Sequence, residues 1–554
     1  MFSFDLTTDP WIPVMTRDGR QTVSLRVALL EAHHLLGVAL DSPLEAVALF
    51  RQVLLPVYLD ALFVDAGCRY PRTPREWSQL WAAAVLDRHP PWADPGPDAK
   101  GPIDAYLDRY RDRFQVFGTH PLAQVATLRA VNGETKPVSV LIASAASGNN
   151  VPLFSARTEA TPPTLSPAEA IRATLATHCW DTAAIKSGAD GDPMVRAGKT
   201  TGNPTGPLGG IGVVLPLGNT LAQTLLLHVP VTSATGVDDR PQWRAGPDQH
   251  PSAGPGWQQR PVRGLLDLLT WQARRIRLVP EAGPDGTTVI RRVVLSAGDR
   301  MTRLPDEIEP HTAWRMSKNS KEQVPVRHTV GQSAWRGMLP MLATAANNPH
   351  GSSPRVLGTI RDLQDHDRDQ LPIDYPLRVL TVGVQYGNQS AVVEDLIVDL
   401  LPMPLAALNA DSSVYQLVEA MVSQADDLRM ATNRLGDELR LAAGGEKLTW
   451  DKGDRLGDRM VHAFNPVARE VLSRLQRRPD DIDATEELWL AEARRIVLTA
   501  AEGALNAVPP ETFIGRVHSL RDIYRAAAAE ARFRAAIRSI LGEPVPAGTP
   551  SGGA

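Results

Sequence analysis

The N-terminal third of the chain carries apolar residues at three- and four-residue spacing, which is the period of a helix with one buried face. One such segment opens with Ser42-Pro43, which suits a helix N-cap followed by a first helical turn. Before the helices, Arg17-Asp18-Gly19-Arg20 predicts a hairpin turn. This part of the chain is therefore expected to be mainly helical core, with helices over residues 24–31, 42–61, 77–86 and 103–114.

The middle of the chain mixes strand-like alternation with helical spacing. Ser166 and Glu169 have the spacing of a capping box at the start of a helix. Further helices are predicted over residues 264–273 and 332–345. Strands are predicted over residues 138–143, 212–216, 224–229, 276–279, 287–295 and 377–384.

From about residue 400 the pattern changes to long helix-period segments, which are residues 412–443, 448–476, 482–507 and 513–541. Short breakers separate them, namely Gly444-Gly445, Pro479 and Pro509-Pro510. Such helices with short connections predict a four-helix bundle. The expected fold class is therefore α+β, with a large mixed N-terminal domain over residues 1–400, the bundle over residues 401–544 and a disordered tail over residues 545–554.

The composition is that of an ordinary soluble globular protein. The chain has 554 residues, of which 43% are hydrophobic, and its mean hydropathy is -0.18. It has no apolar run long enough to span a membrane and no secretion signal at its N-terminus, so a cytoplasmic location is expected. The two cysteines, Cys68 and Cys179, cannot build a zinc site or a disulfide framework.

The net charge is -4, from 58 basic and 62 acidic residues. A protein that holds nucleic acid alone is more often clearly basic. Aromatic residues make up only 5% of the chain, which argues against a stacking platform for single strands. If nucleic acid is the partner, the contact must be local, or an assembly must supply the rest of the affinity.

Residues 188–212 are dense in Gly and Pro and contain no apolar run, which argues against a regular helix or strand interior. A long ordered loop in a compact domain is usually functional, and glycine lets a partner approach the main chain. The centre of this segment therefore predicts a contact surface for phosphates or groove edges, formed by Gly198, Lys199, Thr200, Thr201 and Gly202. A plain surface loop is the other interpretation.

Gly198-Lys199-Thr200 also echoes the end of a phosphate-binding P-loop. Pro193 stands where that motif needs its first Gly, and no clean buried strand leads into the segment. A nucleotide-dependent enzyme is therefore kept as an alternative, and a purely structural scaffold as a second.

Catalytic and metal-binding motifs are not evident in the sequence. Residues 365–369 begin like a calcium loop, but Gln370 replaces the turn Gly and Pro376 the closing Glu. The adjacent His33 and His34, and further histidines at 178 and 311, lack a metal-ligand spacing. These observations favour a binding protein over an enzyme, and no metal or cofactor is expected.

Several short motifs, taken in order, carry a resemblance that covers nearly the whole chain. They are Asp9-Pro-Trp-Ile-Pro-Val14, Thr119-His-Pro-Leu122, Ser147-Gly-Asn-Asn-Val-Pro-Leu-Phe154, the Gly-rich segment and Tyr386-Gly-Asn-Gln389. Together with the closing helices they resemble the CasA family, the large subunit of the type I-E CRISPR surveillance complex Cascade. The resemblance implies a non-catalytic subunit that recognises the protospacer-adjacent motif (PAM) in duplex DNA. It also implies that the subunit starts strand separation and provides a platform for a helicase–nuclease.

The resemblance implies roles in DNA binding for specific residues. The family's glycine loop, which meets the minor groove of the PAM, corresponds to Ala197–Gly202. The amide wedge that parts the strands corresponds to Asn388 and Gln389, and the basic finger corresponds to Arg300, with Arg303 as the alternate. Since the minor groove distinguishes base pairs poorly, a loop of this kind is expected to accept several related PAMs.

The resemblance also implies a docking region. The family loop that follows the Gly-Asn-Asn turn contacts the guide RNA handle and neighbouring subunits, which points to Asn149, Asn150 and Phe154. Some family members carry a four-cysteine zinc knob in mid-chain. This sequence lacks those cysteines, so the expectation of no metal is unchanged.

Overall fold

The computed structural model describes residues 2–85, 100–143, 145, 163–232, 238–245, 256–317, 319, 322–342, 351–448, 455–517 and 523–543. The chain divides into two compact units. Unit 1 comprises Met1–Gln332, Ala343–Pro372 and Leu377–Leu400, and unit 2 comprises Ser333–Leu342, Ile373–Pro376 and Leu401–Ala554. Two short segments before residue 400 therefore group with unit 2, although the sequence placed them in the N-terminal domain.

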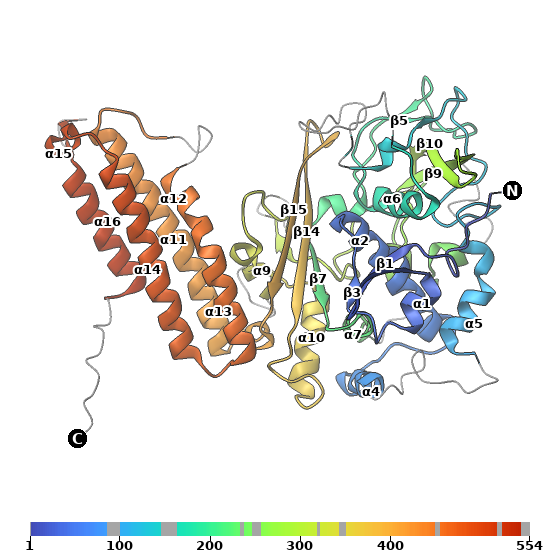
Figure 1. Ribbon diagram of the computed structural model, residues 1–554, viewed down its shortest axis with the longest axis horizontal. Helices are drawn as coiled ribbons and strands as arrows, with labels where there is room; N and C mark the ends of the chain where they lie inside the picture. Colours follow the sequence, from blue (N-terminus) through green and yellow to red (C-terminus); the bar gives the residue numbers. More distant parts are fainter. Residues whose placement is uncertain are drawn as a thin grey trace. The chain divides into compact units, whose positions relative to one another are not determined.

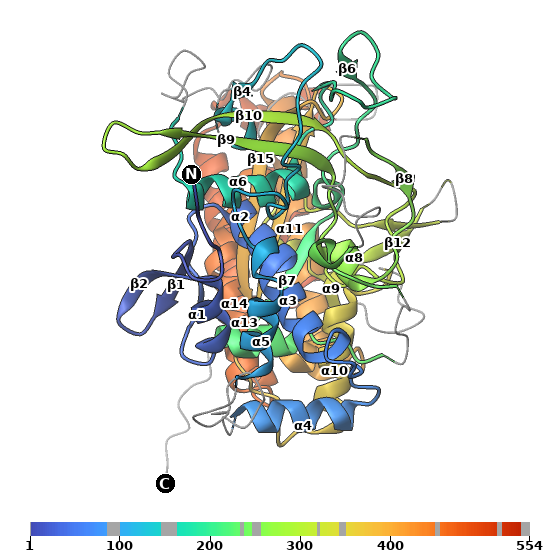
Figure 2. The same ribbon diagram turned by 90° about the vertical axis from the view of Figure 1, so that its right-hand side faces the viewer.

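The helices of unit 1 include a long apolar helix near the N-terminus, over Pro43–Val64. They are α1 (Leu25–Leu30), α2 (Pro43–Leu49), α3 (Leu55–Leu59), α4 (Pro74–Val85), α5 (Pro102–Arg109), α6 (Pro167–Trp180), α7 (Leu221–Leu227), α8 (Leu265–Leu269) and α10 (Arg355–His366). Ser42 caps α2 by accepting the Glu45 N–H, as its sequence predicts. Helix α2 packs against α6, as Figures 1 and 2 show.

The π-helical turn Phe50–Leu54 joins α2 to α3, and a second one, Asp60–Val64, extends α3, so that one helix runs over Pro43–Val64. Among the described residues, this helix alone is long and apolar enough to cross a membrane, with a mean hydropathy of 1.7. However, 89% of its apolar window is buried inside the protein. The apolar composition is thus accounted for by the core of unit 1.

Three sheets of unit 1 contain the strands near the N-terminus or the strands that carry the candidate site. The first has the order β2 (Gly19–Val23), β1 (Ile12–Thr16), β3 (Gly37–Val38). The second has the order β4 (Lys136–Pro137), β10 (Thr288–Ala297), β5 (Lys186–Ser187), β6 (Lys199–Thr200), and β9 (Arg274–Ala282) also pairs with β10. The third has the order β15 (Val392–Pro402), β14 (Arg378–Gly387), β7 (Val213–Leu217). Figure 1 shows β14 and β15 as a long hairpin.

Two smaller strand pairs complete the described part of unit 1. Strand β8 (Gln259–Arg260) runs parallel to β11 (Arg300–Met301). Strand β12 (Trp314–Met316) runs antiparallel to β13 (Gln323–Pro325). Arg300 therefore lies in a short strand.

Two predicted strands are wrong. Residues 138–143 were predicted as a strand, but Val138–Leu141 form a 3-10 turn and only Lys136–Pro137 pair with β10. Residues 224–229 were predicted as a strand, but they fall largely in α7, which Thr220 caps by accepting the Gln223 N–H. Short apolar runs do not distinguish a strand from a buried helix, and the Thr220 cap was the missed signal.

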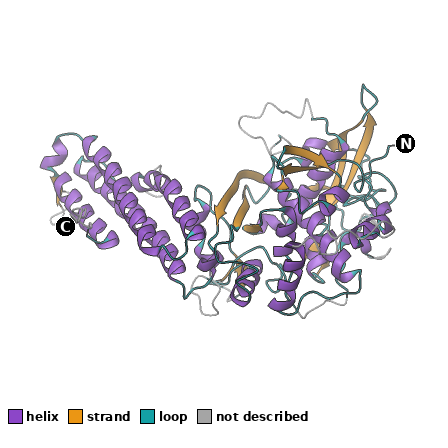
Figure 3. Cartoon of the chain, turned by 60° about the horizontal axis from the view of Figure 1, so that its bottom comes forward, coloured by secondary structure: helices purple, strands orange, loops and turns teal. Residues whose placement is uncertain are grey.

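Unit 2 is mainly helical in its described residues. Its helices are α9 (Leu339–Leu342), α11 (Ser413–Ala442), α12 (Leu456–Met460), α13 (Asn465–Arg477), α14 (Ile482–Asn506), α15 (Glu511–Ile514) and α16 (Ala526–Leu541). Helix α11 packs against α12, α14 and α16, and α13 packs against α14. Figure 3 shows the long C-terminal helices side by side.

The segment Ser333–Leu342 packs into unit 2 through several contacts, which include one buried aromatic side chain. Trp335 is fully buried, its ring centroid lies 6.5 Å from that of Trp489, and its Nε1–H donates to Asn465 Oδ1 at 2.8 Å. The helix predicted over residues 332–345 begins instead as a 3-10 turn at Ala334–Gly337, which α9 follows, and residues 343–345 lie outside the described residues.

Two of the helical segments predicted in the C-terminal part are interrupted. Within residues 448–476, the short α12 and α13 are joined by a 3-10 turn at Val461–Phe464. Within residues 513–541, α15 ends before Gly515, whose φ of +84° is incompatible with a right-handed helix. The short strands β16 (Arg516–Val517) and β17 (Ile523–Tyr524) precede α16. Helix α16 itself carries three arginines, Arg532, Arg534 and Arg538.

The buried His178 on α6 makes the stability of unit 1 pH-dependent. Its Nε2–H donates to the Ala123 carbonyl at 2.9 Å, and its Nδ1 accepts the Arg274 N–H at 3.3 Å, so a second proton has no acceptor. Burial lowers the pKa of His178 from 6.5 to about 4. Because the folded pKa lies below the unfolded one, the stabilisation is present above the unfolded pKa and is lost as the pH falls from 6.5 to about 4.

We therefore expect protonation of His178 alone to lower the free energy of unfolding by about 3 kcal/mol as the pH falls from 6.5 to about 4. The measurement is urea unfolding of the chain and of His178→Gln, whose amide keeps a donor and an acceptor but does not titrate. The difference in stability between the two proteins should shrink as the pH falls. Parallel pH profiles would contradict the assignment.

Candidate functional site

The centre of the Gly-rich segment is a two-stranded ribbon with a tight turn. Strands β5 and β6 pair with Lys186 opposite Thr200 and Ser187 opposite Lys199. Arg196 and Lys199 exchange both backbone hydrogen bonds, at 2.9 and 3.0 Å. Positive φ at both central residues, +48° at Ala197 and +73° at Gly198, gives the primed hairpin turn, for which glycine is favoured. The segment was predicted to contain no strand, so this short ribbon is a correction.

The ribbon has one buried and one exposed face. Lys186 and Thr200 are 5% and 3% exposed, whereas Lys199, Thr201 and Gly202 are exposed. Since neighbouring side chains of a strand point to opposite faces, Lys199 is directed outward and Thr200 inward. The structure thus separates the predicted contact residues, because the Thr200 side chain is turned away from a ligand on the exposed face.

The ribbon does not have the surroundings of a P-loop. In that motif, the Lys and the following Ser or Thr open a helix whose N-terminus faces the phosphates. Here Lys199 and Thr200 form β6, and the next helical element is the 3-10 turn Pro207–Gly210. This geometry does not support the nucleotide-dependent alternative.

Arg300 lies against the glycine loop (Ala197–Gly202). Its Nη2 donates to the Thr201 carbonyl at 2.9 Å and to Asn203 Oδ1 at 3.3 Å. The guanidinium lies 3.8 Å from the ring centroid of Trp257, a cation–π distance. A Cβ added at Gly202 would lie 3.9 Å from Arg300 Nη1, so the cation stands directly beside that exposed glycine.

The alternate basic residue has different surroundings. Arg303 pairs with Asp306 and Glu307, each at 2.7 Å, and its side chain is 62% exposed. Two carboxylates beside one guanidinium cancel its charge locally. Of the two candidates for the basic finger, Arg300 is therefore the one beside the glycine loop.

The predicted amide wedge occupies the turn between β14 and β15. Asn388, Gln389 and Ser390 all have left-handed backbone conformations, with φ of +43°, +58° and +61°. Each such non-glycine residue costs about 1 kcal/mol or more, so neighbouring structure must hold the turn. The Ala391 N–H donates to the Gly387 carbonyl at 3.1 Å, and the side chains of Asn388 and Gln389 are exposed.

Backbone hydrogen bonds of residues 183–187 join this turn to the ribbon. The Ala183 N–H donates to the Ser390 carbonyl at 2.8 Å. Asn203 Nδ2 donates to the carbonyls of Ala184 at 3.3 Å and Thr200 at 2.9 Å. The elements therefore form one surface, here called the loop–turn surface, which comprises Lys199, Thr201, Gly202, Arg300, Asn388 and Gln389.

A buried ion cluster supports the loop–turn surface from below. Asp181 pairs with Lys186 Nζ at 2.7 Å and with Arg274 Nε. Arg274 Nη2 also donates to the carbonyls of Thr182 at 2.9 Å and Pro204 at 2.8 Å. Burial raises the pKa of Asp181, but the two cations more than offset it, so the pKa lies below its usual value. The ionised carboxylate thus holds Arg274, which in turn ties Thr182 to Pro204.

Sequence reasoning missed several residues that build this surface. Arg274 gave no local signal, because its pairing with Asp181 joins segments far apart in the chain. Asp181 and Lys186 are close in sequence, but nothing in the sequence indicated that both side chains would be buried together. Trp257 lies in the stretch over residues 232–261, which gave no helix or strand signal and which also contains Trp243. Asn203, directly after Gly202, was the one detectable signal, because Asn commonly hydrogen-bonds neighbouring backbone groups in turns.

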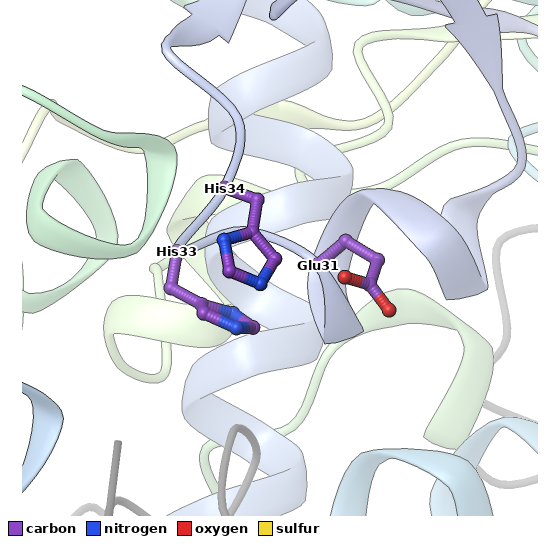
Figure 4. A group of neighbouring side chains, drawn as sticks. All are labelled: Glu31, His33 and His34. Carbon is purple, nitrogen blue, oxygen red and sulfur yellow. The ribbon is translucent and has the colours of Figure 1, made fainter.

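A separate group of side chains could hold a metal ion. In the part of the chain that the structure describes, Glu31, His33 and His34 each offer one ligand atom within 4.8 Å of the others (Figure 4). Zinc ligands lie roughly 3.3 Å apart when bonded, so these side chains would have to draw closer. The sequence analysis found no metal-ligand spacing at His33 and His34 and did not single out Glu31. These side chains lie at and just after the C-terminal end of α1. The expected absence of a metal site stays a prediction.

The predicted docking residues Asn149, Asn150 and Phe154 lie outside the described residues. The predicted tail over residues 545–554 also lies outside them. Both interpretations stay predictions.

Comparisons with known proteins cover both units. The family described as CRISPR-associated protein Cse1 matches residues 5–500. The curated CRISPR-associated protein CasA/Cse1 of Thermus thermophilus is 30% identical over 471 residues, which are 84% of this chain and 82% of that protein. The crystal structure of Thermobifida fusca Cse1 is 29% identical with a TM-score of 0.81, and covers 97% of this chain and 98% of its own. Cse1 from Acidimicrobium ferrooxidans is 29% identical with a TM-score of 0.78, and covers 98% of this chain and 99% of its own.

Proposed function

This chain belongs to the Cse1 family of CRISPR-associated proteins, and we propose that it is the large, non-catalytic subunit of a type I-E RNA-guided surveillance complex. In this role it recognises the PAM in double-stranded DNA and starts strand separation, the first step of R-loop formation. It then provides the docking platform for a helicase–nuclease. Its partners are the other Cascade subunits, the guide RNA and the target duplex, and it acts in the cytoplasm without a cofactor.

The observation that carries this proposal is the loop–turn surface. An exposed backbone ribbon with Lys199, Thr201 and Gly202 lies beside Arg300, whose cation is held in place by Trp257. A minor groove offers few distinguishing groups but a strongly negative potential, so glycine backbone and one cation suit it. Recognition by such a surface tolerates several related PAMs.

The amide turn of the same surface fits strand separation. Side-chain amides both donate and accept hydrogen bonds, so Asn388 and Gln389 can replace base-pair hydrogen bonds as the first pair opens. Their turn is anchored through Ser390 to the same segment that carries β5. PAM contact and the first unpairing step are therefore coupled in one rigid element, while guide pairing supplies the remaining specificity.

The net charge of -4 is consistent with a subunit of a larger assembly. The non-specific grip on DNA depends on many phosphate contacts, which an acidic chain cannot supply alone. We propose that α11, α12 with α13, α14 and α16 form a four-helix bundle that helps hold opened DNA. We also propose that Asn149, Asn150 and Phe154 contribute to docking on the guide-bearing core.

Hydroxyl-radical footprinting of the assembled complex tests this function against a purely structural scaffold. The minor groove of the PAM base pairs should be protected in complexes that contain this chain. A complex that includes the chain but leaves the PAM unprotected would contradict the proposal. Nucleotide binding by the isolated chain would instead support the nucleotide-dependent alternative.

Arg300→Ala and Arg303→Ala form a matched pair of variants. Arg300→Ala should weaken PAM-duplex binding by roughly tenfold and reduce the slope of log affinity against log salt by about 1. Arg303→Ala should change neither, because Asp306 and Glu307 already neutralise that guanidinium. Binding titrations at several salt concentrations measure both quantities. An equal loss of PAM-duplex affinity in the two variants would show that Arg300 contributes no more to DNA binding than Arg303 does.

A further inference from the structure

Ile185 is a large apolar side chain placed outside the core. It is 57% exposed, although it immediately precedes β5, whose Lys186 is 5% exposed. Because neighbouring side chains of an extended segment point to opposite faces, Ile185 belongs to the exposed face of the ribbon. That face also carries Lys199 and Thr201.

The backbone around Ile185 places it between the two halves of the loop–turn surface. On one side, the Ala183 N–H binds the Ser390 carbonyl of the amide turn at 2.8 Å. On the other side, the antiparallel register that pairs Lys186 with Thr200 sets Ile185 opposite Thr201 when it is continued by one residue. Ile185 thus stands where the glycine loop and the amide turn meet.

An apolar group at this point has a defined partner in duplex DNA. When the first base pair next to the PAM opens, the neighbouring pair loses its stacked partner and exposes an apolar face. The amides of Asn388 and Gln389 can replace lost hydrogen bonds but not lost stacking. Proteins that deform duplexes through the minor groove commonly insert Leu, Ile or Met at the unstacked step.

We propose that Ile185 packs against the base-pair face left exposed at the PAM edge, and so lowers the barrier to strand opening. This inference rests on the proposed function and adds an apolar stacking contact to it. Ile185 acts on opening rather than on PAM preference, because an apolar side chain carries no hydrogen-bond information.

The chain offers a matched control. Val131 is 52% exposed and its N–H binds the Gly188 carbonyl at 3.0 Å, beyond the other end of β5. Both residues are β-branched and exposed to a similar degree, but only Ile185 adjoins the amide turn. Comparing Ile185→Ala with Val131→Ala therefore separates the position from the general loss of apolar surface.

The experiment measures strand opening by the assembled complex with a fluorescent base analogue next to the PAM. Ile185→Ala should open a fully paired target roughly tenfold more slowly. A target with pre-melted base pairs beside the PAM should restore the rate to within about twofold of the unsubstituted complex. Ile185→Leu should open the paired target nearly normally, and Val131→Ala should match the unsubstituted complex.

Normal opening by Ile185→Ala would overturn the inference, and so would an equal defect on paired and pre-melted targets or in Val131→Ala. PAM-duplex affinity measured on the same proteins separates this failure from failure of the proposed function. If Gly202→Asp abolishes PAM binding while Ile185→Ala opens DNA normally, only the inference about Ile185 is wrong. If Gly202→Asp leaves PAM binding intact, the proposed function of the site is wrong.

Discussion

Gly202→Asp is expected to weaken PAM-duplex binding by the assembled complex at least about 100-fold, equivalent to ~2.7 kcal/mol, while the chain remains folded. Gly202 is exposed, so the substitution creates no core defect. Its φ of +66° lies in the left-handed region, which disfavours most side chains but which Asp adopts more readily. Folding should therefore be affected only slightly.

The loss of binding has two electrostatic causes. A Cβ at this position stands 3.9 Å from Arg300 Nη1, so the new carboxylate can pair with that guanidinium and cancel its charge. The same carboxylate also repels the phosphates that flank a minor groove. Bulk on the exposed glycine adds a steric barrier to close approach.

Gly202→Asn is the matched control, because Asn has nearly the same shape and the same tolerance of positive φ without the charge. It should bind the PAM duplex at least roughly tenfold better than Gly202→Asp. Titration of both variants with PAM-bearing and PAM-lacking duplexes, together with their melting temperatures, checks the result. Equal losses in the two variants would rule out the charge mechanism, and unchanged affinity in both would remove this loop from the site.

Gln389→Ala is expected to slow strand separation on a fully paired target by at least roughly tenfold, with PAM-duplex affinity nearly unchanged. The amide can replace base-pair hydrogen bonds only while a pair is opening, so its loss raises the opening barrier rather than weakening the initial contact. Ala keeps a Cβ, so the cost of the left-handed conformation at Gln389 changes little.

A target with pre-melted base pairs next to the PAM should largely rescue Gln389→Ala, because that DNA has already lost its pairing. Stopped-flow fluorescence of a base analogue on both targets gives the rates. A defect of equal size on the two targets would mean that Gln389 contributes to binding or folding, and the wedge assignment would be wrong.

Local signals in the sequence were sufficient for much of the fold. Ser42 and Ser166 cap the helices that they were expected to begin, and Ser166 with Glu169 forms the full capping box. The alternating residues of β9 and β10 pair as an antiparallel hairpin. Helix α11 begins at Ser413 after its Ser412 cap. For the three helices the deciding groups lie within four residues of one another, and for the two strands the alternation is itself a local pattern, so no tertiary information was needed.

The arrangement of the candidate site depended on contacts that no local pattern shows. The sequence favoured Arg300 with Arg303 as the alternate, and only the folded chain places Arg300 on Trp257. The acidic neighbour of Arg303, Asp306, is three residues away and was a local signal that was missed. Likewise, the inward direction of Thr200 follows from its pairing with Lys186, whose ion-pair partner Asp181 is also bound by Arg274 from a distant segment. The composition of the Gly-rich segment predicted its importance but not which of its side chains face outward.

The proposed role in PAM recognition is tested most directly by the binding of target duplexes to the guide-bearing complex, assembled with and without this chain. Duplexes that differ only in the PAM should be compared at one fixed salt concentration, since affinity for DNA depends strongly on salt. The complex containing the chain should prefer the PAM duplex by at least about 100-fold, and the complex lacking it should show no preference. An equal PAM preference in both complexes, or failure of the chain to join the complex, would contradict the account.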